Sequence, residues 1–374
     1  MRNIIFIAPG ELLIPSEKGA IEEIIWKTSL ELSKLGFNVY IYNPMSKSLL
    51  SKITKGLTLS DKPNHSKDEV ILHFHDMFAC LSYTFKNLRI KNVVLTFHYP
   101  PWRTKNKRHF LLLVSALKYL TGRNVVMTAP SKAVVYWLKK VLDANAYLIP
   151  NGVDTTLFHP SKRSQELREK LLENKEVLIS YVARIHPDKN QLDLLKAVNI
   201  LVNNYGIKNI KVVFIGPIQG AFNAEIRSDI KINPYFVLLK SFIEKKRLKE
   251  YVIFLGEVPR KEEAAYILAS SDIYVHTAVT EAGVPLAIME AMASGLPIVA
   301  YDTVYYRDYL KNNENSILVK RGDVATLAHV LETLITQETI RKTLGTKART
   351  FAEENLSWEK IVKKYYVVLY AGFQ

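Results

Sequence analysis

The sequence of 374 residues contains a single cysteine, Cys80. One thiol excludes an internal disulfide, a cysteine-based zinc site and an iron–sulfur cluster, and it favours a reducing environment. The longest apolar run, Phe110–Leu117, is far shorter than the ~20 residues that a membrane-spanning helix needs. The N-terminal apolar stretch ends at Pro9-Gly10 and does not read as a signal peptide. We therefore expect a cytoplasmic protein that is at most peripheral on the inner face of the membrane.

Acidic residues are missing from Met77 to Leu142, a stretch that carries twelve Lys and Arg residues. Residues 1–150 hold 21 basic and 10 acidic residues, whereas the rest of the chain holds 30 and 26. The formal net charge of +15 is therefore concentrated in the first part of the chain. Such a patch predicts an anionic partner, whether phosphates, nucleic acid or acidic lipid.

Short apolar runs alternate with helix-like patterns along the whole chain, which is typical of parallel strands in doubly wound α/β sheets. The alternation restarts after residue 160, just beyond the turn-rich stretch Pro150–Asp154. We predict two Rossmann-like domains, residues 1–155 and 156–357, with the last helix, 358–374, packing back onto the first. Residues 219–247 read as irregular and basic.

The turn after the first predicted strand lacks a Gly-x-Gly-x-x-Gly motif, which disfavours NAD binding. It offers instead the small residues Gly19 and Ala20 at the start of a predicted helix, 21–35. Small residues there let backbone N–H groups approach a phosphate. A plain strand-to-helix turn is the alternative.

Three histidines stand at predicted strand ends, where open α/β sheets place their ligands. His73 and His75 close one strand with both side chains on the same face, and His98 closes the next. A histidine there can donate a hydrogen bond to a substrate oxygen, and a structural histidine is the alternative. Zinc would need a third close ligand, which is not evident, so no metal site is predicted.

Two cations, Arg184 and Lys189, lie five positions apart between a predicted strand and helix. A guanidinium fork and a point charge in one turn can hold a diphosphate from two sides. A solvated loop with incidental charge is the alternative.

The strongest signal is the stretch from Thr280 to Pro297, which lies between two predicted strands. The turn Gly283-Val284-Pro285 begins a helix with Pro at its first position. Glu290 lies inside that otherwise apolar helix, where a carboxylate is costly unless it is paired or binds hydroxyls. With Glu281 just before the helix, this stretch suits a ligand that carries both phosphate and hydroxyl groups.

Together these stretches resemble the retaining GT-B glycosyltransferases of family 4, also called glycosyl transferases group 1, over nearly the whole chain. The fold implied is α/β, with two Rossmann-like doubly wound parallel-sheet domains facing a cleft. The pieces that carry the resemblance, in order, are Gly19–Glu22, Thr96–His98, Ile149–Asp154, Tyr181–Lys189, Phe254–Pro259, Ser271–Val275, Glu290–Pro297 and Ser357-Trp358.

The resemblance implies a hexosyl transfer from a nucleotide-diphosphate sugar, bound mainly to the second domain, to a hydroxyl acceptor bound mainly to the first. The acceptor is a lipid-linked molecule, a glycan or a small molecule. Arg184 and Lys189 would hold the diphosphate and offset the charge of the leaving group. The remaining residues that the resemblance implies are His98 beside the reacting sugar, Glu281 on the donor-sugar hydroxyls, Glu290 on the ribose, and Gly19, Ala20, Val258, Gly283, Val284 and Pro285 in the nucleotide-sugar-binding set.

Such enzymes usually need no metal, and the chain lacks an Asp-x-Asp pair, so no cofactor besides the donor substrate is expected. The family pairs two glutamates eight positions apart, whereas Glu281 and Glu290 are nine apart with Ala282 between them. A one-residue bulge could deliver Glu281, and otherwise backbone amides near Gly283 and Val284 must hold the sugar. Ala20 and Ala183 replace family glycines and are still small.

Two other functions stay open. Ala282 is compatible with a catalytically weak GT-B scaffold, and the net charge with a nucleic-acid-binding protein, although no helix-turn-helix, RRM or KH pattern is present. The basic segment Trp102–Arg108 and the apolar run that follows it have the composition of an interfacial segment. They predict docking on an anionic membrane beside a lipid-linked acceptor, with the core face of a helix as the alternative.

Overall fold

The computed structural model describes residues 3–8, 14, 19–43, 52–54, 57–60, 70–86, 92–98, 107–122, 125–173, 175–218, 233–258, 261–281 and 283–373. The chain divides into two compact units. The first comprises Met1–Gly152, Glu281–Val284 and Leu356–Gln374, and the second comprises Val153–Thr280 and Pro285–Asn355. The division at Gly152 lies three residues before the boundary expected from the sequence.

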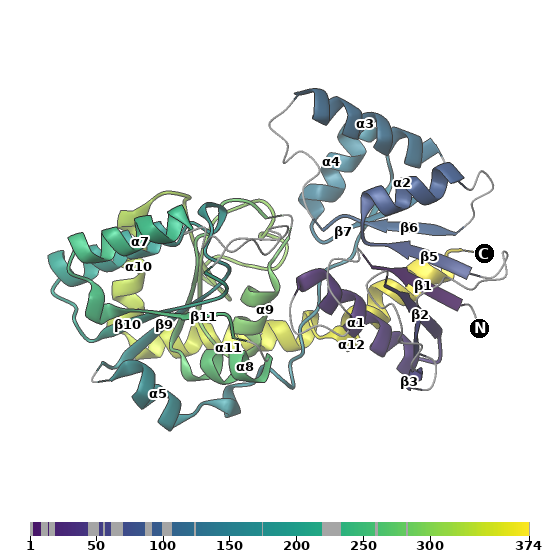
Figure 1. Cartoon of the computed structure of the whole chain (residues 1–374). Coiled ribbons are helices and arrows are strands. Elements are labelled where there is room, and N and C mark those ends of the chain that lie inside the picture. The colour runs from purple at the N-terminus through teal and green to yellow at the C-terminus, as the bar shows by residue number, and fades with distance from the viewer. Residues whose placement is uncertain are drawn as a thin grey trace, which may run out of the picture. The chain divides into compact units, whose positions relative to one another are not determined.

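The first unit contains an eight-stranded sheet in the order β3-β4-β2-β1-β5-β6-β7-β8 (Figure 1). All strands are parallel except β3, which runs antiparallel to β4 at the edge. The edge strands β3 and β4 were not predicted, because three and four residues give little periodic signal. The strands are β1 (Asn3–Ile7), β2 (Asn38–Tyr42), β3 (Lys52–Thr54), β4 (Leu57–Ser60), β5 (Val70–Phe74), β6 (Val93–Thr96), β7 (Val126–Ala129) and β8 (Ala146–Leu148).

Helix α1 (Ala20–Lys34) packs one side against this sheet, because Ile24, Ile25 and Leu32 recur at helical spacing and are buried. Helix α4 begins at Ser131, whose hydroxyl accepts a hydrogen bond from the Val134 amide, a standard N-cap. The other helices of this region are α2 (Met77–Lys86), α3 (Lys107–Gly122) and α4 (Lys132–Leu142).

The C-terminal segment belongs to the core of the first unit. Tyr366, Leu369 and Tyr370 are buried in the same cluster as the side chains of β1 and α1. Gly152 lies so close to the Trp358 indole that a Cβ there would be 2.5 Å from the ring, which leaves room only for glycine. The segment consists of α12 (Trp358–Ile361), the π-helical η5 (Val362–Tyr366) and α13 (Val367–Ala371).

The second unit is built on a fully parallel six-stranded sheet in the order β11-β10-β9-β12-β13-β14. Figure 1 shows helices on both faces of this sheet. Sheet residues such as Ile179 and Val212 pack with α6, α7 and α10, and Leu178 and Val213 pack with α5 and α8. Its strands are β9 (Val177–Val182), β10 (Ile210–Ile215), β11 (Val252–Gly256), β12 (Ile273–His276), β13 (Ile298–Tyr301) and β14 (Ile317–Val319).

The helices of this unit differ from the sequence analysis at α5, α7 and α11. Residues 219–247, expected to be irregular, contain α7, which begins after the Asn233 cap. The 18-residue α11 was not predicted, because its buried stripe is made of small residues such as Ala348 and Ala352. The helices are α5 (Gln165–Leu172), α6 (Gln191–Asn199), α7 (Pro234–Lys245), α8 (Lys261–Ser270), α9 (Leu286–Ala293), α10 (Val324–Thr336) and α11 (Glu338–Asn355).

Two parallel sheets, each covered by helices, confirm the predicted fold class of two Rossmann-like doubly wound domains. Continuous apolar strands indicated this class correctly, because a parallel strand that is buried on both faces has no polar alternation. No helix in the described part of the chain combines the length and hydropathy needed to cross a bilayer.

Candidate active site

The two predicted diphosphate-binding cations lie in the loop that follows β9. Arg184 is in the extended part of the loop, and Lys189 ends a short 3-10 helix, η2 (Pro187–Lys189). Both residues are partly exposed. Their backbone carbonyls are fixed from inside the unit: Gln191 Nε2 donates to the Arg184 oxygen over 2.9 Å, and the Tyr181 hydroxyl donates to the Lys189 oxygen. A buried scaffold therefore holds a loop that presents two cations to solvent.

Neighbouring strands support this loop through residues that the sequence analysis missed. Gly216, directly after β10, has φ 140°, and a Cβ there would lie 2.3 Å from the Ala183 carbonyl oxygen. After β12, Thr277 Oγ1 donates to the Asn190 carbonyl over 2.8 Å, and the Val279 amide donates to the Asp188 carbonyl over 2.9 Å. A glycine that directly follows a buried strand was the available sequence signal for Gly216. The carboxyl ends of β9, β10 and β12 thus meet at the cation loop.

The charge of Arg184 has no ion-pair partner among the described residues. A partly exposed guanidinium without a carboxylate partner keeps its two-pronged donor geometry available for phosphate oxygens. This loop can bind an anion without first breaking an internal salt bridge of Arg184.

Glu290 is buried in α9, as the sequence predicted, but it has a basic partner that the sequence did not reveal. Lys261 Nζ, at the start of α8, lies 2.5 Å from Glu290 Oε1. The two residues are 29 positions apart, so a search of the neighbouring turns could not find the pair. Since Lys261 contacts Oε1, the second carboxylate oxygen of Glu290 is available as an acceptor for ligand hydroxyls.

The start of α9 also differs slightly from expectation. Pro285 is the residue before the helix, which begins at Leu286, so Pro285 is not at the first helical position. Val258, after β11, is partly exposed and packs against the apolar cluster of α5 and α8. Glu281–Val284 belongs to the first unit, where a Cβ on Gly283 would lie 3.0 Å from Pro130 side-chain atoms. Ala282 lies outside the described residues, so the expected bulge before Gly283 stays a prediction.

The three predicted histidines come together in the first unit. The rings of His73 and His75 stack with centroids 4.6 Å apart, and those of His75 and His98 stack at 4.9 Å. His75 Nδ1 and His98 Nε2 lie 2.7 Å apart. The parallel pairing of β5 with β6 puts the carboxyl ends of both strands at one edge of the sheet. The prediction that His73 and His75 share a face is therefore confirmed.

His73 connects this stack to two other parts of the first unit. Its Nδ1 lies 2.7 Å from Tyr370 Oη, and its Nε2 lies 2.6 Å from Thr96 Oγ1. Thr96 Oγ1 in turn lies 2.6 Å from Thr128 Oγ1 on β7. Tyr370 was not in the predicted site, because only the fold brings the C-terminal helix to this strand edge.

Burial keeps these histidines uncharged. It lowers the pKa of His73 to about 3 and that of His98 to about 4, and it lowers the pKa of His75 well below its ordinary value. The neighbouring rings add to these shifts, because a second positive charge in the stack would repel the first. At neutral pH the cluster can therefore exchange hydrogen bonds but carries no net charge.

Gly19 precedes α1 and has φ 89°, a conformation that favours glycine. Gly19 is partly exposed and Ala20 is exposed, so the backbone at the start of α1 is accessible. Glu22 and Glu23 occupy the first turn of the helix. Their negative charge already complements the helix N-terminus, which makes this turn better suited to a neutral hydroxyl than to a phosphate.

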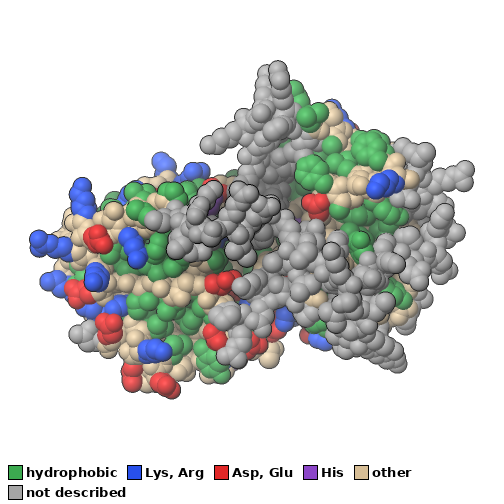
Figure 2. Space-filling view, in the orientation of Figure 1, with side chains coloured by type: hydrophobic (Ala, Val, Ile, Leu, Met, Phe, Trp, Pro, Cys, Tyr) green, Lys and Arg blue, Asp and Glu red, His purple; other side chains and the backbone are tan. Residues whose placement is uncertain are grey.

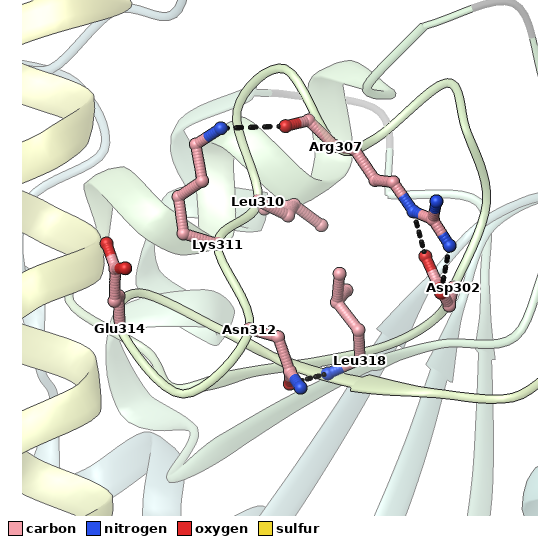
Figure 3. A pocket seen from close by; sticks show the side chains of 7 residues that line it. All are labelled: Asp302, Arg307, Leu310, Lys311, Asn312, Glu314 and Leu318. Atoms are coloured by element: carbon pink, nitrogen blue, oxygen red, sulfur yellow. Dashed lines mark hydrogen bonds and ion pairs between the residues drawn. The ribbon is translucent and has the colours of Figure 1, made fainter.

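Metal and cavity observations add no competing site. Among the described residues, no group of three or more His, Cys, Asp and Glu side chains is arranged to hold a metal ion. A cavity of about 340 Å³ lies beside β14 (Figure 3). Arg307 forms a two-pronged ion pair with Asp302 in its wall, and Lys311 donates to the Arg307 carbonyl. It contains none of the predicted site residues.

Comparisons with known proteins identify the family. The model of the family described as "Glycosyl transferases group 1" matches residues 163–351. The chain belongs to the glycosyl transferase group 1 family. The match falls on the stretch that carries Arg184, Lys189 and Glu290, and it leaves most of the first unit unmatched.

Individual relatives extend this result. The chain is 28% identical, over 186 residues, to the UDP-Gal:alpha-D-GlcNAc-diphosphoundecaprenol alpha-1,3-galactosyltransferase of Escherichia coli. That match covers 49% of this chain and 43% of the relative, so the chain matches less than half the length of this curated relative.

Solved structures of the same fold cover the chain from end to end. Sucrose-phosphate synthase from Thermosynechococcus elongatus has a TM-score of 0.78 at 16% identity, covering all of both chains. HepE from Anabaena, solved with UDP and with UDP-glucose, has a TM-score of 0.76 at 18% identity, covering 99% of this chain and all of that one. These likenesses confirm the predicted GT-B fold.

Proposed function

We propose that this chain is a retaining hexosyltransferase that moves a sugar from a nucleotide-diphosphate sugar to a hydroxyl acceptor. The observation that carries the proposal is the cation loop of Arg184 and Lys189, which lies within the stretch matched by the family model. The E. coli relative is named for a UDP-sugar donor, and HepE was solved with UDP-glucose. A UDP-sugar is therefore the donor to test first.

In this proposal the cation loop stabilises the leaving group. When the bond between the anomeric carbon and the phosphate oxygen breaks, negative charge grows on the diphosphate. Gln191, Tyr181 and the strand ends already hold the backbone that carries Arg184 and Lys189, so the loop need not be rebuilt as that charge develops. The acceptor oxygen bonds to the same face of the sugar, and its proton leaves with the departing phosphate.

Carboxylates and backbone groups would orient the sugar and the nucleoside. Glu290 accepts hydrogen bonds from the ribose hydroxyls while Lys261 keeps its charge paired. Glu281 takes hydroxyls of the donor sugar, and the amides of Gly283 and Val284 add two donors. Val258 lies against the nucleoside, and Pro285 directs the chain into α9. No metal is needed in this scheme, since the two cations take its place.

The first unit would bind the acceptor, and His98 would hydrogen-bond near the reacting sugar. Gly19 and Ala20 suit an acceptor hydroxyl, because Glu22 and Glu23 already compensate the N-terminus of α1. A lipid-linked acceptor fits the name of the E. coli relative, which carries a diphosphoundecaprenol group.

A surface of the first unit supports docking of the enzyme on an anionic membrane. Phe78 on α2 and Leu112 on α3 are 72% and 68% exposed, and Phe85 and Leu111 are also exposed. Figure 2 shows hydrophobic side chains over this part of the unit. Within α3, Leu117 is buried, whereas Leu111 and Leu112 are exposed and so are available to a lipid surface.

The charge around these exposed apolar residues favours an anionic lipid leaflet as their partner. Lys118 and Lys140 are exposed on α3 and α4, whereas the exposed Lys139 pairs with Asp143. The sequence from Met77 to Leu142 has no acidic residue. Exposed apolar groups beside basic ones match an anionic lipid leaflet, where each cation contributes about 1 kcal/mol. The segment from Trp102 to Asn106, on which the sequence argument relied most, lies outside the described residues.

A donor panel tests the proposal. UDP-, GDP- and ADP-sugars are added to the protein, and both the melting temperature and the release of nucleoside diphosphate are measured. We expect a UDP-sugar to raise the melting temperature and to be turned over slowly by water. Stabilisation without turnover, with every acceptor tried, would favour the scaffold. Strong salt-sensitive binding of DNA or RNA without a response to any nucleotide sugar would favour the nucleic-acid-binding alternative.

A further inference from the structure

His75 occupies a position in the first unit that the proposed reaction does not use directly. It is 4% exposed and lies between two other imidazoles, with His73 stacked on it at 4.6 Å and His98 at 4.9 Å. Its Nδ1 faces His98 Nε2 at 2.7 Å. No described residue offers a hydrogen-bond partner to its other nitrogen, Nε2.

We propose that His75 is a positioning residue that donates its Nδ1–H to Nε2 of His98 and thereby fixes His98 as the tautomer with its proton on Nδ1. A hydrogen bond between two neutral imidazoles needs one donor and one acceptor, so only two arrangements are possible. In the reverse arrangement, His75 would carry its proton on Nε2 and bury an N–H group without a partner. The assigned arrangement leaves only an unpaired lone pair there, and buried orphan N–H groups are the rarer of the two.

The ring of His75 is itself held in place by His73. Both nitrogens of His73 are engaged, Nδ1 with the Tyr370 hydroxyl and Nε2 with the Thr96 hydroxyl. Since the His73 ring cannot rotate without breaking one of these bonds, its face is a fixed stacking surface for His75. The chain of contacts runs from the C-terminal helix α13 through His73 and His75 to His98.

The consequence for His98 is a defined chemical role. With Nε2 accepting from His75, the remaining nitrogen, Nδ1, is a hydrogen-bond donor, and no described residue takes that bond. A neutral ring with a fixed N–H stabilises an oxygen of the reacting sugar or acceptor, and it does not act as a base toward the acceptor hydroxyl. This role rests on the proposed function, whereas the tautomer assignment does not.

Nitrogen NMR on the full chain tests the assignment directly. The protein is labelled with 15N-histidine, and long-range proton–nitrogen spectra distinguish protonated from unprotonated ring nitrogens. His98 is identified by the loss of its signals in His98→Gln, and His329→Gln, on the exposed side of α10, is the matched control. We expect Nδ1 of His98 to be protonated and Nε2 to be the acceptor. A His98 protonated on Nε2 in the wild-type protein would overturn the proposal, whatever the activity of the His75 variants.

Two substitutions at His75 separate positioning from bulk structure. In His75→Asn the side-chain amide nitrogen takes the place of Nδ1–H, whereas His75→Leu fills similar space without a donor. We expect His75→Leu to lower kcat by about tenfold with unchanged UDP affinity, the size of one lost hydrogen bond. His75→Asn should keep most of the activity.

The outcomes distinguish this inference from the proposed function. Equal loss of kcat in His75→Asn and His75→Leu, with both variants folded, would overturn the positioning role. A wild-type protein that shows the Nδ1–H tautomer but transfers no sugar would contradict the proposed function and leave the assignment of the tautomer supported.

Discussion

The cation loop of the second unit and the histidine stack of the first unit prepare a site in opposite ways. In the cation loop, Arg184 and Lys189 are partly exposed, and neutral buried groups fix only the backbone that carries them. In the histidine stack, the rings are uncharged and stacked, His73 and His75 are buried, and His75 is hydrogen-bonded to the partly buried His98. The exposed charges of the cation loop suit an anion that arrives from solvent. The fixed rings of the histidine stack suit a single hydrogen bond of defined direction.

The comparison extends to sequence similarity. The family model matches residues 163–351, which lie almost entirely in the second unit, and leaves the histidine stack unmatched. In the proposed function, binding a diphosphate requires the same cations whichever acceptor is used. In the proposed function the first unit binds one particular acceptor. Its sequence is therefore expected to differ more between family members than that of the second unit.

The largest effect is expected from the cation loop. Arg184→Ala and Lys189→Ala should each weaken UDP binding by roughly ten- to a hundredfold, because each removes a charge-assisted contact of about 1.5–3 kcal/mol. Titration calorimetry measures the loss. Lys347→Ala, an exposed cation on α11, is the matched control and should bind UDP normally. Unchanged affinity in both loop variants would remove the diphosphate assignment.

A smaller effect is expected at the buried ion pair. Glu290→Gln should weaken UDP by about tenfold, because an amide is a poorer acceptor for ribose hydroxyls than a carboxylate. Lys261→Met leaves the carboxylate but removes its partner, so it should cost stability more than affinity. Urea unfolding and calorimetry on both variants separate the two quantities. If both variants lose stability equally and bind UDP equally well, Glu290 is only one half of a structural ion pair.

Vesicle binding should change by less for each residue. Replacing Lys118 and Lys140 by Gln should weaken binding to vesicles with acidic lipid by about fivefold per charge, from ~1 kcal/mol each. Phe78→Ser should weaken it as well, and Tyr205→Ser, exposed in the second unit, is the control. Co-sedimentation is measured with neutral and acidic vesicles at low and high salt. Equal binding to both kinds of vesicle would exclude electrostatic docking.

A separate effect, on stability rather than on binding, concerns pH and arises at the histidine stack of the first unit. The unfolded chain binds protons at histidine near pH 6.5, whereas burial lowers the pKa of His98 to about 4 and that of His73 to about 3. The unfolded state therefore binds more protons in this window, and the free energy of unfolding should fall as pH decreases from about 6.5 to 4. Urea midpoints at several pH values measure the slope. His73→Gln should flatten it, and an equally steep slope in that variant would argue against the assignment.

Local pattern was sufficient for the fold class and for placing candidate site residues at strand ends, while their roles stay predictions. Buried parallel strands show continuous apolar runs, and such runs in the sequence coincide with β9, β12 and β13. Arg184, Lys189 and the three histidines were found because parallel sheets place ligands at the carboxyl ends of their strands, a rule that needs only the order of elements. Helix α11 escaped because its stripe of small residues carries little hydrophobic signal.

Partners distant in sequence were decided only by the tertiary structure. Lys261 meets Glu290 across 29 positions, and Tyr370 meets His73 across 297, and neither distance leaves a local pattern to read. Burial also determines which ring nitrogen carries the proton in each histidine of the stack, because an imidazole in water populates both tautomers. The sequence by itself determined which groups stand at the strand ends. Packing alone decided which of them are charged, which are paired and which cannot turn, because desolvation and contact exist only once the chain is folded.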